Sequence, residues 1–387
     1  MSKIHTNYDF VFVLPGFSLT PAGGYMVIFE LAVDLQRKGY AVLIIFLRRL
    51  YYNLYAITQE RAFLDTYRPF GLIHRVLSKV TLLITPKNFH FFLDIAKKLG
   101  FNVNENAFTF LKDFRFVIKD NIPKHLDTKR LIATAWGTAY FVNKYSQKTI
   151  KYYLVQNSED DVSFSGSLSK FATRTYSFPL KKIVINRVTQ NRFVQDNPIK
   201  ITVASHVNAE LRIDPKDRMG CIAIQLRNGE DKGAEYAIGA IKIIHDRHKE
   251  IRIESYGNYK GAIPDFVVHH GFMPEEDYIN MFNRSTIFIL PSIVEGFSTP
   301  VLESMTCGSV PVATKCGGPE EMIENNVNGI LVPIKSPNAI AEAVGYLLSN
   351  NETRISMAHN AIDTSKRYTR EAMYQSFING IKNHESY

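Results

Sequence analysis

Short apolar runs alternate with helix-like segments along most of the chain, and this alternation constrains the fold more than any other feature. The run Phe10–Leu14 resembles a buried strand, and Ile28, Leu31 and Leu35 then recur on one face of a helix. A second apolar run follows at Ala41–Leu47. A strand, a helix and a strand in this order form a unit whose strands lie parallel in a sheet that helices cover.

The same alternation begins again near residue 220. We expect strands at 131–135, 151–155, 182–185, 221–226, 252–256, 266–269, 286–290, 310–313 and 329–332. Helices are expected at 234–245, 275–282, 300–307, 319–325 and 337–348. The sequence therefore predicts an α/β fold of two Rossmann-like, doubly wound parallel-sheet domains that face a central cleft. We place these domains at 1–207 and 208–367, and expect a helix within 368–387 that crosses back to the first domain.

The net charge of +9 is distributed unevenly. Residues 1–205 hold 28 Lys and Arg against 14 Asp and Glu, whereas residues 206–387 hold 18 against 23. A basic half suits an anionic membrane surface, a phosphate-bearing acceptor or nucleic acid. No apolar run approaches the ~18 residues of a membrane-spanning helix, and three cysteines without a C-x-x-C pair disfavour a disulfide framework. We expect a cytoplasmic protein that can lie on a membrane surface.

Ligands of open α/β sheets bind beyond the carboxyl ends of the strands, so the loops there are the candidate site. Gly23 and Gly24 precede the first helix, where the bare backbone and the free amides can approach an anion. Arg227 and Lys232 follow the strand at 221–226 and can converge on one diphosphate. Taken alone, the glycines also fit an ordinary turn, and the basic pair also fits a solvated charged turn.

The loop after the strand at 286–290 is the most informative. Thr299 can cap the next helix, because Pro300 suits the first helical position. Glu295 then lies in the loop, and Glu303 lies about one turn into the helix. Carboxylates accept hydroxyl protons while free amides bind phosphate oxygens, so the loop suits a ligand that carries both. Alternatively, both glutamates simply stabilise the helix N-terminus.

These two glutamates have an E-x7-E spacing, and the segment EGFSTPVLE resembles the signature of family GT4, the retaining glycosyltransferases of the GT-B fold. The resemblance extends to the glycine pair, to the basic pair, and to the segments HHGFMPEEDYINMFNRSTIFILPS and PVATKCGGPEEMIENNVNGILV. It covers nearly all of residues 215–350 and parts of 8–47 and 130–210. The motifs occur in order, which makes the pattern far more specific than E-x7-E alone.

The resemblance implies roles for the charged residues. Arg227 and Lys232 are expected to bind the diphosphate of a nucleotide sugar and to stabilise the leaving group. Glu295 is expected to contact the sugar hydroxyls, and Glu303 the ribose. The first three are the catalytic candidates.

The resemblance also implies donor contacts outside these side chains. The glycine pair would close over the phosphates, the segment at 272–273 would border the base, and the amides before the helix would support the sugar and phosphate. These donor-binding candidates are Gly23, Gly24, Phe272, Met273, Phe297, Ser298 and Thr299.

One position departs from the family pattern. Many GT4 members have a histidine where this chain has Gln156. The local sequence YLVQNSED resembles a subset with V-Q-x-x-E that includes bacterial rhamnosyltransferases. This match makes Glu159 a further catalytic candidate. The alternative is that Glu159 is an ordinary acidic residue on the surface.

The expected reaction needs a stabilised leaving group more than a strong protein base. The chain contains no D-x-D sequence, so we expect no metal and no cofactor beyond the nucleotide sugar. The resemblance implies retention, with same-face attack assisted by the leaving phosphate. The acceptor is expected to be a glycan, a lipid-linked glycan or another hydroxyl compound made during polysaccharide biosynthesis.

Three other readings remain open at this point. The basic half could bind nucleic acid, but its basic residues are scattered and match no known nucleic-acid module, so we expect no nucleic-acid partner. The same fold could carry a sugar-nucleotide epimerase, or a donor-binding protein that has lost its activity. We prefer to assign the basic, aromatic segment 48–92 to an anionic membrane surface or a lipid-phosphate-linked glycan.

Overall fold

The computed structural model describes residues 7–16, 23–48, 50, 94, 98, 115–160, 168–218 and 220–386. Contacts within the chain divide it into two compact units. The first unit comprises residues 1–184, 189–201 and 376–387, and the second unit comprises residues 185–188 and 202–375. These bounds differ in detail from the predicted ranges 1–207, 208–367 and 368–387. The segment 185–188 packs with the second unit, and the last helix is divided between Gln375 and Ser376.

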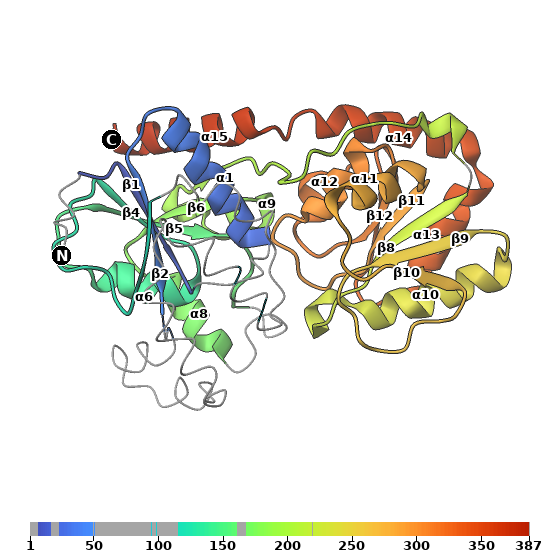
Figure 1. Ribbon diagram of the computed structural model, residues 1–387, viewed down its shortest axis with the longest axis horizontal. Coiled ribbons are helices and arrows are strands. Elements are labelled where there is room, and N and C mark those ends of the chain that lie inside the picture. Colours follow the sequence, from blue (N-terminus) through green and yellow to red (C-terminus); the bar gives the residue numbers. More distant parts are fainter. Residues whose placement is uncertain are drawn as a thin grey trace. The chain divides into compact units, whose positions relative to one another are not determined.

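The first unit contains a seven-stranded parallel sheet with the order β3-β2-β1-β4-β5-β6-β7 (Figure 1). Its strands are β1 (Phe10–Leu14), β2 (Val42–Leu47), β3 (Phe116–Lys119), β4 (Arg130–Ala133), β5 (Ile150–Val155), β6 (Lys181–Val184) and β7 (Ile199–Lys200). Its helices are α1 (Gly23–Arg37), α6 (Trp136–Lys144), α8 (Ser169–Thr175) and α9 (Arg187–Arg192), of which α9 begins within 185–188.

Alternation along β1 explains how this sheet is covered. Val11 and Val13 belong to a core cluster with residues of α6 and α8. Phe10 and Phe12 point to the other face, where Phe377 of α15 (Arg370–Glu385) packs with ring centroids 5.5 and 6.3 Å away. Because both faces are covered, the strand is apolar at every position, as expected for a parallel sheet.

The second unit contains a six-stranded parallel sheet with the order β10-β9-β8-β11-β12-β13. Its strands are β8 (Cys221–Gln225), β9 (Arg252–Tyr256), β10 (Val267–His269), β11 (Ile287–Leu290), β12 (Val310–Thr314) and β13 (Ile330–Val332). Its helices are α10 (Ala234–Arg247), α11 (Glu275–Arg284), α12 (Thr299–Thr306), α13 (Pro337–Ser349) and α14 (Asn351–Ser365). Two Rossmann-like parallel-sheet units are thus confirmed.

Two local predictions are wrong. The segment predicted as a helix at 319–325 forms only a short 3-10 turn, Pro319–Glu321. Asn328 causes this break, because its side chain accepts from the Glu324 amide at 2.8 Å and donates to the Met322 carbonyl at 3.0 Å. Thr299 does not cap α12 but is its first residue, and Ser298 occupies the cap position.

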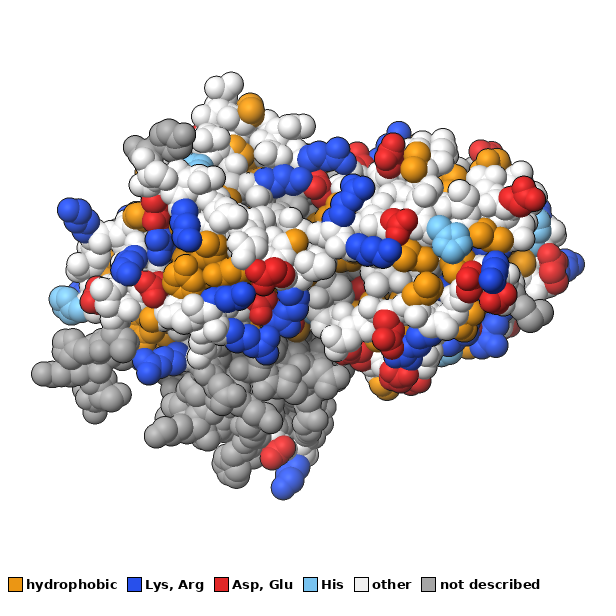
Figure 2. All heavy atoms as spheres, turned by 90° about the horizontal axis from the view of Figure 1, so that it is seen from above, with side chains coloured by type: hydrophobic (Ala, Val, Ile, Leu, Met, Phe, Trp, Pro, Cys, Tyr) orange, Lys and Arg blue, Asp and Glu red, His pale blue; other side chains and the backbone are white. Residues whose placement is uncertain are grey.

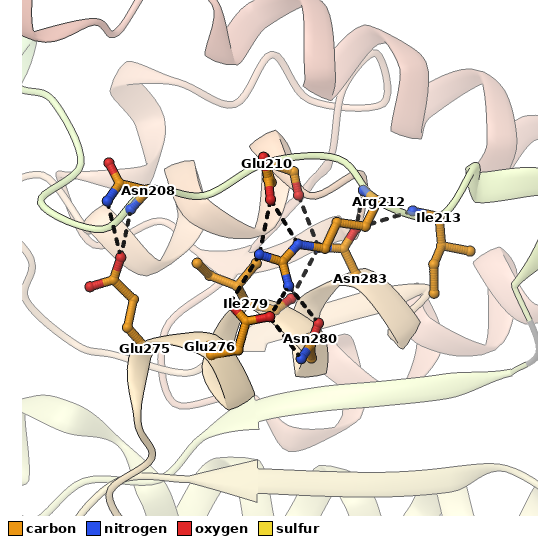
Figure 3. A network of polar contacts seen from close by, with 9 residues as sticks. All are labelled: Asn208, Glu210, Arg212, Ile213, Glu275, Glu276, Ile279, Asn280 and Asn283. Atoms are coloured by element: carbon orange, nitrogen blue, oxygen red, sulfur yellow. Dashed lines mark hydrogen bonds and ion pairs between the residues drawn. The ribbon is translucent and has the colours of Figure 1, made fainter.

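The linker into the second unit is fixed to α11. Asn283 accepts from the Arg212 amide at 2.6 Å and donates to the Glu210 carbonyl at 2.9 Å. The Arg212 guanidinium pairs with the Glu276 carboxylate and with the Asn280 side chain (Figure 3). Residues 208–213 therefore move with this unit.

Candidate functional site

The loops after β8 and β11 lie side by side in the second unit. The amide of Ile293 donates to the carbonyl of Asp231 at 2.8 Å. Gly233 is the N-cap of α10 with φ +61°, and a Cβ there would clash with the carbonyl oxygen of Pro291. Glycine is therefore required at this position both for its backbone conformation and for the close approach of the two loops.

Lys232 is the fixed cation of these loops. Its Nζ lies 3.0 Å from Oε1 of Glu295 and 3.1 Å from Oδ2 of Asp231. Burial opposes the charge on Lys232, but the two carboxylates outweigh burial and raise its pKa. Ser292 also donates to Glu295 at 2.8 Å. The structure thus brings two of the sequence candidates, Lys232 and Glu295, into direct contact.

Arg227 lies at the end of β8 and is partly exposed. Among the described residues, no hydrogen bond or ion pair is made by its guanidinium. An arginine in this state has all its side-chain donors available for an anion.

The segment before α12 has hydrogen-bonding groups that find no partner among the described residues. Ser298 is 6% exposed, and its Oγ has no partner within the described part of the chain. The same residue has φ +73°, a conformation that L-residues rarely adopt outside functional sites. Across the described ranges, the amides of Phe297 and Ser298 find no acceptor. Unused donors at a helix N-terminus form a site for an anion.

The segment after β12 supports this loop from the other side. The amide of Glu295 donates to the Cys316 carbonyl at 2.9 Å, and the amide of Gly318 donates to the Glu295 carbonyl at 2.8 Å. A Cβ on Gly318 would lie only 2.6 Å from the backbone of Phe297. Glycine at 318 therefore lets the two backbones pack against each other.

Glu303 lies inside the unit and is 1% exposed. Its Oε1 accepts from the Ser205 hydroxyl at 2.9 Å, and its Oε2 accepts from the Tyr278 hydroxyl at 2.6 Å. Each carboxylate oxygen has a second lone pair, so both can accept a further hydroxyl from a ligand. The sequence analysis missed Ser205 and Tyr278, because no motif links either residue to Glu303.

Phe272 and Met273 follow β10. Phe272 is 72% exposed, which leaves its ring free to contact a ligand, and Met273 is half-buried. Their expected position beside a base remains a prediction.

In the first unit, the glycine pair begins α1. A Cβ on Gly24 would lie 3.2 Å from Oε1 of Gln156, so these two sequence candidates are neighbours. Gln156 donates to the Thr134 carbonyl at 3.1 Å, while its buried Oε1 has no partner in the described ranges. Within the described part of the chain, no heavy atom lies within 4 Å of a Cβ built on Gly23. The residue in the place of the family histidine thus lies next to the glycine turn.

Glu159 is buried, so the surface-acid alternative is wrong. Burial raises its pKa to about 8, although the Tyr153 hydroxyl, which donates to its carboxyl group, lowers it. A carboxyl group with this pKa is mostly protonated at pH 7. Its catalytic role remains a prediction.

The described residues show no cluster of three or more metal-ligating side chains. None of the helices in the described ranges is both long and apolar enough to cross a membrane.

Superposition on solved structures of the GT-B fold shows that the chain has this fold. HepE of Anabaena, solved with UDP-glucose, superposes with a TM-score of 0.67 at 14% identity, over 97% of this chain and 100% of that one. Sucrose-phosphate synthase of Thermosynechococcus elongatus superposes with a TM-score of 0.66 at 12% identity, over 98% and 99%.

Residues 226–364 match the family described as glycosyl transferases group 1. An uncharacterized glycosyltransferase of Methanocaldococcus jannaschii is 25% identical over 64% of this chain and 65% of its own length. An N,N'-diacetylbacillosaminyl-diphospho-undecaprenol alpha-1,3-N-acetylgalactosaminyltransferase of Campylobacter jejuni is 29% identical over 28% of this chain and 29% of its own length. The chain therefore matches less than two thirds of either relative.

Proposed function

We propose that the chain is a glycosyltransferase that moves a sugar from a nucleotide diphosphate sugar to an acceptor hydroxyl. The observation that carries this proposal is the Lys232–Glu295 pair, in which Glu295 lies in the same loop as the Ser298 hydroxyl, which has no partner among the described residues. The pair offers a cation for a phosphate and a carboxylate for sugar hydroxyls, next to helix N-terminal amides that have no acceptor within the described ranges. All of these residues lie in the segment that matches the group 1 glycosyltransferases.

The reaction breaks the bond between the anomeric carbon and the diphosphate oxygen and forms a bond from that carbon to the acceptor oxygen. Negative charge develops on the diphosphate, where Arg227, Lys232 and the amides before α12 stabilise it. We propose retention, in which the acceptor attacks on the face that the diphosphate leaves and gives its proton to the departing phosphate. The basic side chains take the place of a bridging metal in this scheme.

The relatives support a class of donor and a class of acceptor, but no individual substrate. The Campylobacter relative is named for an undecaprenol-diphosphate acceptor, and the Anabaena structure contains UDP-glucose. We propose a nucleotide-sugar donor and a glycan or lipid-linked acceptor. The V-Q-x-x-E segment makes rhamnose one donor sugar to be tested.

A lipid-linked acceptor requires the protein to work at a membrane surface, which the excess of Lys and Arg in residues 1–205 favours. The segment 48–92 assigned to this contact lies, except for residues 48 and 50, outside the described residues. Over the described atoms of the face in Figure 2, basic and acidic side chains are interspersed. Flotation with liposomes that contain or lack anionic lipid tests this contact, and equal binding to both would reject it.

A donor screen tests the proposed function. The protein is incubated with a panel of UDP-, GDP- and dTDP-sugars, with and without lipid-linked and free glycans, and released nucleoside diphosphate is measured. Release from one donor is expected, and both Glu295→Ala and Lys232→Ala should lower it strongly. Lys366→Ala is the matched control, because this exposed lysine pairs only with Asp363 among the described residues. No release and no binding of any nucleoside diphosphate would reject the proposal.

A further inference from the structure

The dipeptide Asn186-Arg187 contacts the candidate donor loops from a part of the chain that carries no donor motif. It lies one residue after the end of β6, yet the segment 185–188 packs within the second unit. Asn186 is 2% exposed, and its side-chain amide donates to the carbonyl of Gly296 in the loop before α12. A buried side chain that binds a loop carbonyl restricts the conformation of that loop.

The contact at Gly296 acts on a group that the donor needs. The carbonyl of Gly296 and the amide of Phe297 belong to one planar, trans peptide unit, so they point in opposite directions. When Asn186 holds the carbonyl, it also fixes the direction of the Phe297 N–H. This N–H is one of the amides without an acceptor among the described residues.

Arg187 holds the supporting segment after β12. Its amide donates to Oε2 of Glu321 at 2.9 Å, and its guanidinium donates to the Glu320 carbonyl at 2.8 Å. The carboxylate of Glu320 in turn accepts from the Gly317 amide at 2.8 Å. Gly317 precedes Gly318, whose amide binds the carbonyl of Glu295. Asn186 thus holds the loop before α12, and Arg187 holds the segment after β12. These two segments meet at Glu295.

We infer that Asn186 and Arg187 are positioning residues that hold the loop amides in the orientation that binds the diphosphate of the donor. This inference rests on the proposed function, because it assigns the loop amides to a nucleoside diphosphate. Neither residue contacts the reacting atoms. Both act through the backbone of the loop.

The test measures binding of UDP, GDP, ADP and dTDP by calorimetry, well below the unfolding temperature, for the parent and for each variant. Asn186→Ala is expected to weaken binding of the preferred nucleotide about tenfold, because a buried carbonyl loses its donor. Arg187→Ala is expected to weaken it about threefold, because this side chain is exposed. The double variant should lose less than the product of the two factors, because both residues hold one loop.

Asn283→Ala is the matched control. Asn283 is also a buried asparagine that donates to backbone carbonyls, but it lies on α11 and binds the linker. It should lose stability without losing nucleotide affinity. If Asn186→Ala does not fold, Arg187→Ala still decides the question, because its exposed side chain tolerates truncation.

The outcomes separate the two proposals. A parent protein that binds a nucleoside diphosphate, with Asn186 and Arg187 variants that bind it equally well, would overturn this inference and leave the proposed function intact. If Asn283→Ala lost as much nucleotide affinity as Asn186→Ala, the inference would also be overturned, because general destabilisation of the protein would then explain both losses. A parent that binds none of the four nucleotides would overturn both.

Discussion

The Tyr278 hydroxyl donates to Oε2 of Glu303 at 2.6 Å, which joins α11 to the second glutamate of the E-x7-E pair. Tyr278→Phe leaves a buried carboxylate oxygen with one donor fewer and should lower the free energy of unfolding by about 1–3 kcal/mol. It should also weaken donor binding, because Glu303 then loses its fixed orientation. Urea unfolding and nucleotide titration measure the two effects. Tyr140→Phe removes a comparable hydroxyl in the first unit, bonded to the Phe171 carbonyl, and should change stability alone.

Lys232→Ala removes the cation between Asp231 and Glu295. We expect donor turnover to fall by about 10²–10³-fold, because charge on the leaving diphosphate loses a preorganised partner. Steady-state assays with the donor found in the screen measure this. A variant with turnover within twofold of the parent would show that Lys232 does not stabilise the leaving group.

Ser298→Gly should separate stability from activity. Glycine adopts φ +73° without the steric penalty of a Cβ, so the variant should gain about 1 kcal/mol in free energy of unfolding. It should lose turnover, because a hydroxyl that has no partner among the described residues is removed and the loop becomes more mobile. Ser309→Gly also removes a buried Oγ without a described partner, but its φ is negative, so stability should fall there. Thermal melts of both variants measure the two changes in stability. An equal loss of stability in Ser298→Gly and Ser309→Gly would refute the argument that the backbone of Ser298 is strained.

Gly318→Ala and Gly345→Ala are expected to act in opposite directions. The first places a methyl group 2.6 Å from the Phe297 backbone and should displace the donor loop, with a loss of nucleotide affinity. The second adds a methyl group to α13 with no described atom within 4 Å and should stabilise the protein by about 0.5–1 kcal/mol. Calorimetric titration and thermal unfolding of the two variants test this contrast. If Gly318→Ala kept the nucleotide affinity of the parent, the donor loop would accommodate the methyl group without a change in the binding site.

Glu159→Gln should change the dependence of stability on pH. Burial raises the folded pKa of Glu159 to about 8 from the 4.5 of an unperturbed glutamate, so the native state binds the proton more tightly than the unfolded state. Its contribution is fully present below pH 4.5 and is lost as pH rises through 8. Glutamine cannot ionise, so the variant should lose less stability than the parent between pH 5 and pH 8. Thermal melts of the parent and the variant at these pH values measure the difference. If stability changed with pH by the same amount in both proteins, the raised pKa of Glu159 would be contradicted.

Continuous apolar runs made most strands predictable, because strands buried on both faces need an apolar residue at every position. The helix expected at 319–325 was wrong because three asparagines between 325 and 328 favour turns with local side-chain bonds over a helix. The strand β3 was missed among aromatic and basic residues that have no clear period.

The charged site residues were predictable because their types and spacing form a motif. Residues that hold them, such as Asn186, Ser205 and Tyr278, were not. Each is a common polar residue far from its partner in the sequence, and only tertiary packing brings the two together. Spacing along the chain carries no information about such pairs.

The interleaving of the two units has a consequence for synthesis. Phe377 completes the core on one face of the first sheet, and Glu385 pairs with Arg130 of β4 at 2.6 Å and accepts from Tyr152 of β5 at 2.9 Å. These residues are translated after the whole second unit. A nascent chain therefore cannot finish its first unit on the ribosome before its second, which reverses the usual order of domain completion during translation.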